Sequence, residues 1–347
     1  HETQLAAALR RTPSVLGAAG FDFPSHSTTS GLRVTPLAVH GDDPLPWLRN
    51  FPYVLASLPE LQAAARGQAL LTVSRLDGGV VRRVPLVLAV GQQPVSGLAM
   101  EMLRVASGSS AVEVEVGHYG IEAVRVAELR VPVQENGDVW LHFARSQTSA
   151  ARYLSAADVL SGNFDPERLN GKLVLLGLTG SGLSDMRSTP LGELVPGVEI
   201  QAQLMESLFD GRFILRPWWL KWLETALLLV VGSVMIWAIP RTDGRVAAAL
   251  QKTPRAASWW VIGLNVLIVS VGYLLFYTRG LMFDSASTFI GLSSVLGSLV
   301  SSALIEIDQQ TRRIEADRQR LRENEARVAG ELAAARRIQL GSLPDAE

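Results

Sequence analysis

Three long apolar segments in the second half of the chain constrain its fold more than any other feature. Residues 219–239, 259–277 and 286–305 each approach the roughly 20 helical residues that cross the ~30 Å hydrocarbon core of a bilayer. Only Glu224, near an end, and Asn265, near a middle, bring strongly polar groups into them. Because a charge at the centre of such a helix costs ~3 kcal/mol, this scarcity predicts three transmembrane helices. The alternative is a buried helical hairpin in a large soluble protein.

The ends of these segments carry the residues that mark membrane interfaces and set orientation. Trp218, Trp237 and Tyr277 stand at the ends of the first two segments, as expected for an aromatic belt. Nine Lys and Arg residues lie in the loop after the first segment and shortly after the third, against four on the opposite side. This excess predicts that residues 1–217 lie outside the cell membrane and that the C-terminal tail is cytoplasmic. Export would require a signal or anchor helix upstream.

The composition excludes several classes of function. The absence of cysteine rules out disulfides, thiolate catalysis and zinc sites built on cysteine. A net charge of −1 provides no basic field for nucleic acid. The five histidines are not spaced as metal ligands, and no Gly-x-Ser-x-Gly motif is present. We therefore expect no catalytic residue, no metal site and no cofactor in this chain, and no nucleic-acid partner.

Residues 1–217 alternate between helical and strand patterns, which predicts an α/β domain with a mixed sheet. Asn136-Gly137 predicts a hairpin turn, and Ser155 followed by Asp158 predicts a helix N-cap. The apolar run at residues 172–176, bounded by two glycines, predicts a strand buried in a sheet. The expected helices cover residues 3–10, 59–66, 97–106 and 197–209. The other expected strands cover residues 14–18, 69–74, 83–90, 113–116, 123–129 and 139–143.

Two glycine-containing loops in this domain carry charged residues that could clamp a small charged ligand. These residues are Asp77, Arg82 and Arg83 in the first loop, and Asp185 and Arg187 in the second. The alternative is structural, because Asp and Gly commonly form turns and Arg pairs locally. The glycines after residue 176 match neither the Walker spacing nor the dinucleotide-binding fingerprint.

The third apolar segment and the tail contain two further patterns. Ser293, Gly297 and Ser301 are small residues at a spacing of four, which lets helices approach closely, either inside the three-helix unit or between two copies. In the tail one apolar position recurs every seven residues, while its companion position is mostly polar. This predicts a weak two-stranded coiled coil, and hence a homodimer; the alternative is a single solvated helix. The recurring residues are Ile307, Ile314, Leu321 and Val328.

The two loops also carry a family resemblance. LDGGVVRRVPL at residues 76–86 and GLTGSGLSDMRSTPLGELVPGVEIQAQ at residues 177–203 resemble the second class of CHASE domains. So do the segments GLAMEMLR, SAADVLSG and LNGKLVLLG, in the expected order over residues 50–217 and before three apolar segments. CHASE domains are extracellular sensors of bacterial kinases, cyclases and phosphatases. The resemblance implies an extracytoplasmic ligand or partner protein, and a further helix and strand before His1. The chain departs from the family pattern at Arg75 and Gln201.

ELAAARRIQLGSLP at residues 331–344 is similar to the helical lead-in of SpoIIE-type serine/threonine phosphatases, which belong to the metal-dependent type 2C class. This implies a catalytic domain after Glu347 that requires Mn or Mg. We therefore expect a sensor domain at 1–217, a transmembrane region at 218–305 and a cytoplasmic linker at 306–347. The whole is predicted to be a multi-pass receptor of the bacterial inner membrane. The alternatives are a cyclase or kinase output, or a structural envelope scaffold.

Overall fold

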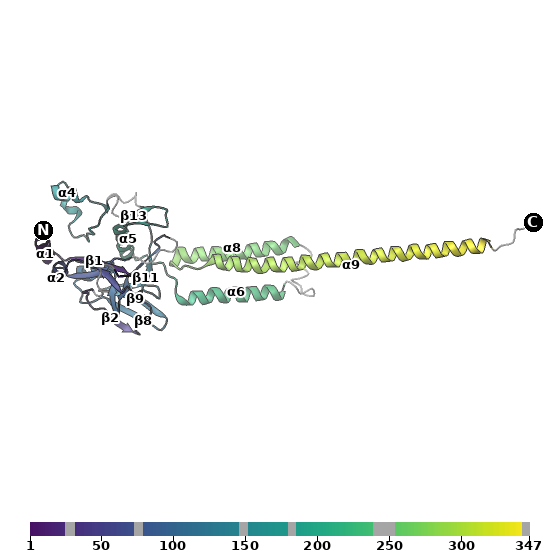
Figure 1. Ribbon diagram of the computed structural model, residues 1–347, viewed down its shortest axis with the longest axis horizontal. Helices are drawn as coiled ribbons and strands as arrows, with labels where there is room; N and C mark the ends of the chain where they lie inside the picture. The colour runs from purple at the N-terminus through teal and green to yellow at the C-terminus, as the bar shows by residue number, and fades with distance from the viewer. Residues whose placement is uncertain (25–31, 73–78, 146–151, 180–184, 239–253, 342–347) are drawn as a thin grey trace, which may run out of the picture. The chain divides into compact units, whose positions relative to one another are not determined.

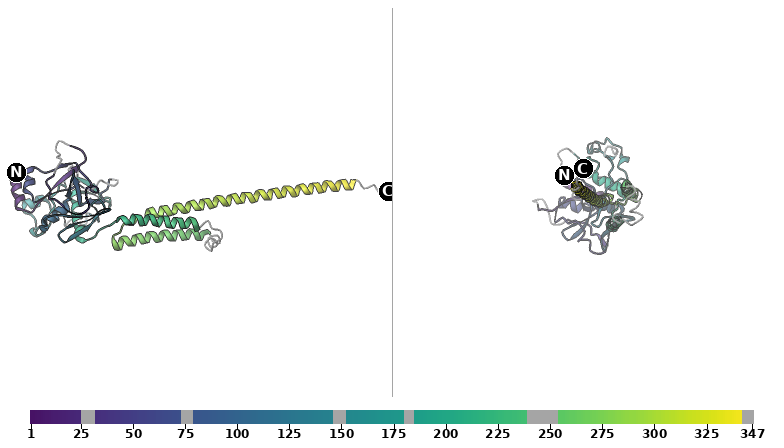
Figure 2. Two further views of the ribbon diagram at one scale, coloured as in Figure 1. Left: turned by 90° about the horizontal axis from the view of Figure 1, so that it is seen from below. Right: turned by 90° about the vertical axis from the view of Figure 1, so that its right-hand side faces the viewer.

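A computed structural model describes residues 1–24, 32–72, 79–145, 152–179, 185–238 and 254–341 (Figures 1 and 2). The chain divides into two compact units. The globular unit comprises His1–Trp222 together with Gly272–Phe283, and the helical unit comprises Leu223–Val271 and Asp284–Glu347. Each unit is described by itself below.

The globular unit contains parallel and antiparallel strand pairs, so the predicted mixed α/β domain is confirmed. In its four-stranded sheet β8 (Glu113–Gly117) pairs antiparallel with β9 (Gly120–Val126) and parallel with β2 (Ala38–Gly41). The other strands are β1 (Val15–Phe21), β3 (Tyr53–Leu55), β4 (Gly67–Leu70), β5 (Arg83–Pro85), β6 (Val87–Val90), β7 (Gln93–Ser96), β10 (Leu129–Pro132), β11 (Asp138–Trp140), β12 (Met186–Ser188) and β13 (Leu194–Pro196). They form the orders β3-β1-β4, β10-β9-β8-β2, β11-β5, β12-β13 and β6-β7.

Two helices close the main core of this unit. The helices of the globular unit are α1 (Glu2–Arg11), α2 (Pro59–Ala64), α3 (Leu98–Ser107), α4 (Ala156–Ser161) and α5 (Gly197–Asp210). Met100 of α3 and Ile200 and Leu204 of α5 are almost fully buried in one apolar cluster with the strands. Each such side chain contributes ~1.5–3 kcal/mol on burial. The α5 helix ends at Gly211, which has the left-handed φ of +64° that favours glycine. The domain core therefore fixes the helix from which the chain leaves toward the apolar helices.

A buried ion pair lies inside this core. Glu101 and Arg104 of α3 form a bidentate pair, with Arg104 Nε 2.9 Å from Glu101 Oε2 and Arg104 Nη2 2.7 Å from Oε1. Ser96 Oγ also donates to this carboxylate, at 3.2 Å. A Cβ added at Gly67 would lie 2.4 Å from Glu101 Oε1, so only glycine fits beside the carboxylate. The hydrogen bond with Glu101 raises the pKa of Arg104.

Three sequence predictions in this unit are corrected. The predicted strand at 83–90 is interrupted at Leu86, because β5 pairs with β11 whereas β6 pairs with β7. Asn136-Gly137 forms a turn, with Gly137 at φ +81°, but β10 and β11 pair with β9 and β5 rather than with each other. The predicted buried strand at 172–176 is wrong, since this segment forms no strand and Leu176 is 92% exposed. The Ser155 N-cap is confirmed: its side chain accepts the N–H of Ala157.

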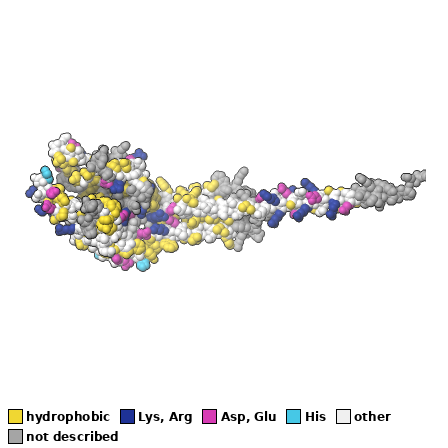
Figure 3. All heavy atoms as spheres, viewed as in Figure 1, with side chains coloured by type: hydrophobic (Ala, Val, Ile, Leu, Met, Phe, Trp, Pro, Cys, Tyr) yellow, Lys and Arg dark blue, Asp and Glu magenta, His cyan; other side chains and the backbone are white. Residues whose placement is uncertain are grey.

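The remaining helices are α6 (Trp218–Ala238), α8 (Pro254–Arg279) and α9 (Ser285–Gly341) (Figure 1). Among the described residues two helical stretches, Trp218–Trp237 and Ile262–Arg279, are long and apolar enough to cross a membrane. The apolar stretch of α9 that the structure describes, Ser285–Leu299, is shorter. In the helical unit α6, α8 and α9 run side by side (Figures 1 and 2). Charged side chains are visible along the later part of α9 (Figure 3).

Close packing joins α6 to α9 inside the helical unit. A Cβ added at Gly291 of α9 would lie 2.6 Å from Leu228 Cδ1 of α6. Leu292 of α9, the next residue, is fully buried. The small residue at position 291 therefore allows the two helices to approach closely.

Candidate functional site

The first predicted ligand loop lies against strand β11. Asp77 falls outside the described residues. The carbonyl of Arg82 accepts the N–H of Leu141 at 3.0 Å, and its side chain is exposed. The guanidinium of Arg83 lies over the ring of Trp140, 5.1 Å from its centroid, which is a cation–π contact. Arg83 is thus held by the domain's own aromatic residue.

The second predicted ligand loop forms its own ion pair. Arg187 Nε donates to Asp185 Oδ1 at 3.0 Å, and both side chains are partly exposed. The carbonyl of Asp185 accepts the N–H of Gly197 at 2.8 Å, at the start of α5. A Cβ at Gly197 would lie 2.2 Å from Asp185 Oδ2, so the carboxylate lies directly on the helix start. Asp185 therefore contacts the first residue of α5 through both its carbonyl and its side chain.

The structure brings the two loops together. The N–H of Val81 donates to the carbonyl of Ser188 at 2.9 Å, and Val80 forms an isolated parallel β-bridge with Ser188. Arg82 and Arg187 therefore belong to neighbouring segments of one surface. Ligand contact by these residues stays a prediction.

A buried polar cluster fixes the face of α5 near this surface. Arg152 Nη1 donates to Glu199 Oε1 at 3.2 Å, and Arg152 Nε donates to Glu206 Oε1 at 2.7 Å. Gln203 Nε2 donates to the same Glu199 oxygen at 3.0 Å and to the carbonyl of Ala144 at 3.2 Å. The Glu199 side chain is fully buried, so its charge depends on these partners. The sequence analysis missed this cluster; the only available signal was a repeated polar residue on an otherwise apolar helix.

A backbone ladder connects the domain to the segments that enter the apolar helices. Trp140 of β11 forms an antiparallel β-bridge with Ile214, four residues after the end of α5. The next residue, Leu215, donates its N–H to the carbonyl of Gly280 at 2.8 Å and accepts the N–H of Met282 at 2.8 Å. Residues 280–282 lie in the connection between α8 and α9, which comprises residues 280–284. Within the globular unit, strand β11 is thus linked through two residues to the segment that leads into α9.

Gly280 is required for this ladder. Its φ is +63°, and a Cβ there would lie 2.4 Å from the carbonyl oxygen of Phe213. Any other residue would be strained and would collide with the backbone of the chain leaving α5. The sequence analysis did not predict this ladder, because its only signal in the sequence is the dipeptide Arg279-Gly280 at the end of an apolar run.

The β8–β9 turn contacts the first turn of α6. Tyr119 stacks on Trp218, with ring centroids 4.3 Å apart. Lys221 Nζ lies 3.0 Å from Glu135 Oε1. Between these two contacts lies a cavity of about 250 Å³, lined by Tyr119, Arg216 and Trp219 among others. The start of α6 is therefore held by side chains of the domain as well as by the chain connection.

In the helical unit Glu224 is bonded to the start of α9. Its Oε1 accepts the N–H of Asp284 at 2.7 Å. Asp284 in turn caps α9, because its Oδ1 accepts the N–H of Ser287 at 3.0 Å. Such caps contribute ~1 kcal/mol. The one acidic residue of the first apolar segment thus has a structural partner at the N-terminus of α9.

Three small residues of α9 at a spacing of four, called here the small-residue stripe, lie in two different environments. They are Ser293, Gly297 and Ser301. Ser293 lines a cavity between α8 and α9, whereas Ser301 is exposed and a Cβ at Gly297 would meet no described atom within 4 Å. In the tail Ile314, Leu321 and Val328 are all at least 50% exposed. The side chain of Ile307 lies outside the described residues. Close helix packing by the stripe and a tail coiled coil stay predictions.

Comparison with known proteins gives one match. The protein-family model described as the CHASE2 domain matches residues 1–239. No curated protein and no solved structure matches the chain. The matched residues include the two loops, Ile214 and Leu215 of the ladder, and all of α6.

Proposed function

Because the chain belongs to the CHASE2 domain family, we propose that it is a bacterial transmembrane receptor that regulates a cytoplasmic output through α9. CHASE2 is an extracellular sensory domain of signalling receptors. The observation that carries the proposal is the ladder at Leu215, since it joins the sensory domain to the segment from which α9 begins.

In this proposal the chain crosses the inner membrane three times. The α6 and α8 helices are long and apolar enough for two crossings. The third consists of the apolar beginning of α9, continued by the uncharged residues up to Ile305. The asymmetry of Lys and Arg orients the domain toward the periplasm and the tail toward the cytoplasm.

In this proposal the signal passes from the two loops to α9 through segments that are hydrogen-bonded to one another. A ligand or partner protein at the two loops moves α5 or β11, and the ladder at Ile214 and Leu215 passes this displacement to residues 280–282. The bond between Glu224 and Asp284 holds the start of α9 against α6. Because α9 is a continuous helix of 57 residues, about 85 Å long at 1.5 Å per residue, a rotation or shift at its start reaches the cytoplasm.

We propose a SpoIIE-type serine/threonine phosphatase as the output, on the likeness of residues 331–344 to the lead-in of that family. Its Mn or Mg site would belong to the catalytic domain rather than to this chain. A nucleotide cyclase or a kinase is the second candidate, because CHASE domains serve those enzymes too. Paired aspartates in the residues that follow Glu347 would favour the phosphatase, and an open reading frame that ends there would favour a scaffold.

Interrupting α9 tests the proposal. Ala326→Pro in the full-length receptor removes a helical hydrogen bond and kinks the helix, whereas Ala326→Ser leaves it intact. We expect the proline variant to insert in the membrane normally but to lose the stimulus-dependent change in output, measured as phosphoserine hydrolysis. Equal regulation in the two variants would contradict transfer through α9.

A further inference from the structure

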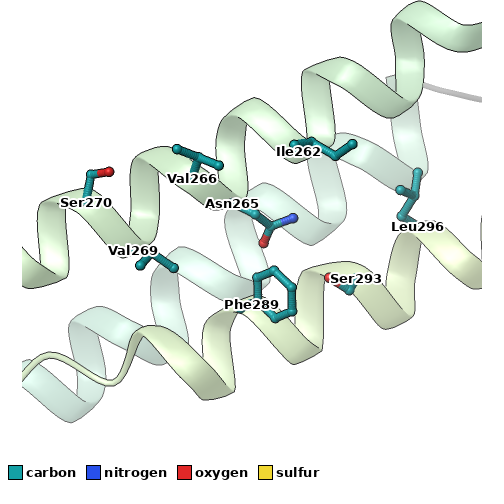
Figure 4. A pocket seen from close by; sticks show the side chains of 8 residues that line it. All are labelled: Ile262, Asn265, Val266, Val269, Ser270, Phe289, Ser293 and Leu296. Atoms are coloured by element: carbon teal, nitrogen blue, oxygen red, sulfur yellow. The ribbon is translucent and has the colours of Figure 1, made fainter.

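The helical unit contains an apolar groove between α8 and α9 (Figure 4). The cavity measures about 590 Å³. Figure 4 shows Asn265 and Val269 of α8 facing Phe289 and Ser293 of α9 across it. Asn265 is 5% exposed, whereas Phe289 is 44% exposed. The groove therefore has a closed polar floor and an open apolar side, as expected of a helix-binding surface inside a membrane.

The groove and the tail seam occupy one face of α9. Ser293 is followed at intervals of seven by Val300, Ile307, Ile314, Leu321 and Val328. Phe289 and Leu296 are the other two residues of α9 that line the groove. They occupy the second core position of the same seven-residue repeat, since Phe289 lies four residues before Ser293 and Leu296 lies three residues after it. A strict seven-residue repeat stays on one face when two helices supercoil. The face that lines the groove thus continues as the apolar seam of the tail.

The tail seam lacks cover in the part of the chain that the structure describes. Leu321 is 61% exposed and Ile314 is 55% exposed, on a helix whose other side chains there are mostly polar. Lipid could fill the groove, but lipid cannot cover Leu321 in the cytoplasm. A partner with the same seven-residue pattern covers both surfaces at once, and α9 itself has that pattern.

We propose that a second copy of this chain places its α9 in the groove between α8 and α9, in parallel. The interface then runs without interruption from Phe289 in the membrane to Val328 in the tail. The proposal rests on the membrane topology of the proposed function, because insertion in one bilayer holds the two copies parallel. Ser293, a small residue at the seam, lets the two α9 helices approach closely.

Because residues 1–347 contain no cysteine, single cysteines introduced there can test this interface in the full-length protein in its native membrane, with every cysteine outside these residues replaced by serine. The probes are Ser293→Cys in the groove and Leu321→Cys in the tail. The matched controls, Ser298→Cys and Ala326→Cys, lie on the opposite face of the same helix. Disulfide formation requires Cα atoms within about 7 Å, so we expect the two probes to form crosslinked dimers about tenfold faster than their controls on mild oxidation.

Three results would overturn the proposal. The first is equal crosslinking of Ser293→Cys and Ser298→Cys, and the second is crosslinking at Leu321→Cys without crosslinking at Ser293→Cys. Absence of any crosslink from a normally inserted protein would also reject the dimer, while leaving the receptor function intact. A membrane-impermeant thiol reagent distinguishes a wrong membrane topology from a wrong interface. Labelling of Ala326→Cys from the periplasmic side would contradict the topology of the proposed function and would not bear on the interface.

Filling the groove provides a second measurement. Val269→Trp places an indole in the cavity, whereas Val271→Trp places it on another face of α8. We expect Val269→Trp to slow crosslinking of Ser293→Cys several-fold and Val271→Trp to leave it unchanged. Equal rates in the two tryptophan variants would show that α9 of the second copy does not occupy the groove.

Discussion

At the scale of single residues, the domain depends on charges that are paired where water cannot reach them. Glu101 is 1% exposed and receives hydrogen bonds from Arg104 and Ser96. An isolated charge in such a position is costly, so each partner stabilises the other mainly by preventing that state. The sequence offers only a Glu and an Arg three residues apart, a spacing that is equally common on solvated helices.

Removing one member of this pair should destabilise the domain strongly. Glu101→Leu leaves the Arg104 guanidinium buried without its carboxylate, and we expect a loss of about 3–5 kcal/mol in the free energy of unfolding. Thermal unfolding followed by circular dichroism measures this loss. Glu115→Leu, at a partly exposed pair, is the control, with an expected loss of about 1 kcal/mol or less. Equal losses in the two variants would contradict the role assigned to burial.

A second residue-scale prediction concerns pH. Hydrogen bonds from Arg130 lower the pKa of Glu115, with Arg125 adding to the effect. A carboxyl whose pKa is lower in the folded state stabilises the fold above its unfolded pKa, and this stabilisation is lost as the pH falls through the folded value. We expect Glu115→Gln to lower stability by less than about 1 kcal/mol at pH 7, and the difference from the unsubstituted chain to shrink below about pH 5. A difference independent of pH would contradict this account.

At the scale of elements, the connection between α8 and α9 is held by hydrogen bonds of its backbone. Leu215 exchanges hydrogen bonds with Gly280 and Met282, and the Glu224 carboxylate binds the first turn of α9. Both contacts act on the same short connection between α8 and α9. Under the proposed function, α9 rather than α6 alone would therefore respond to the domain.

The ladder can be broken with a matched pair of glycine substitutions. Gly280 and Gly211 have nearly the same φ, +63° and +64°, but only Gly280 has a backbone atom within reach of a new Cβ. We expect Gly280→Ala to abolish the amide-exchange protection of Leu215 and Met282 and to weaken the output response. Gly211→Ala carries the same conformational strain without the collision. If both variants respond alike, the ladder does not transmit the signal.

Sequence patterns predicted most helices and strands of the domain, and failed where pairing depends on distant partners. Hydrophobic periodicity and caps located α3, α5 and the Ser155 cap, because those signals are local. The run at 172–176 has the composition of a buried strand, yet no neighbouring strand covers it among the described residues. The Leu215 ladder could not be predicted, because backbone hydrogen bonds between segments 65 residues apart leave no composition signal.

At the scale of the whole molecule, the sequence predicted a sensory domain joined to apolar helices, and the family match confirms the domain. The match begins at His1 and so extends well beyond the residues 50–217 on which the resemblance was recognised. Two of the three predicted spans are long enough among the described residues. Of the candidate ligand residues, Arg82, Arg83, Asp185 and Arg187 lie on two segments that the hydrogen bond from Val81 to Ser188 brings together.

The receptor function depends on the domain and the tail facing different compartments, and site-specific labelling measures this directly. Single cysteines at the exposed positions Ser161 and Ala326 would be treated with a membrane-impermeant maleimide in intact spheroplasts and after permeabilisation. We predict that Ser161→Cys is labelled in both preparations and Ala326→Cys only after permeabilisation. Labelling of both positions in intact spheroplasts would place both ends in one compartment and contradict transmission of a signal across the membrane.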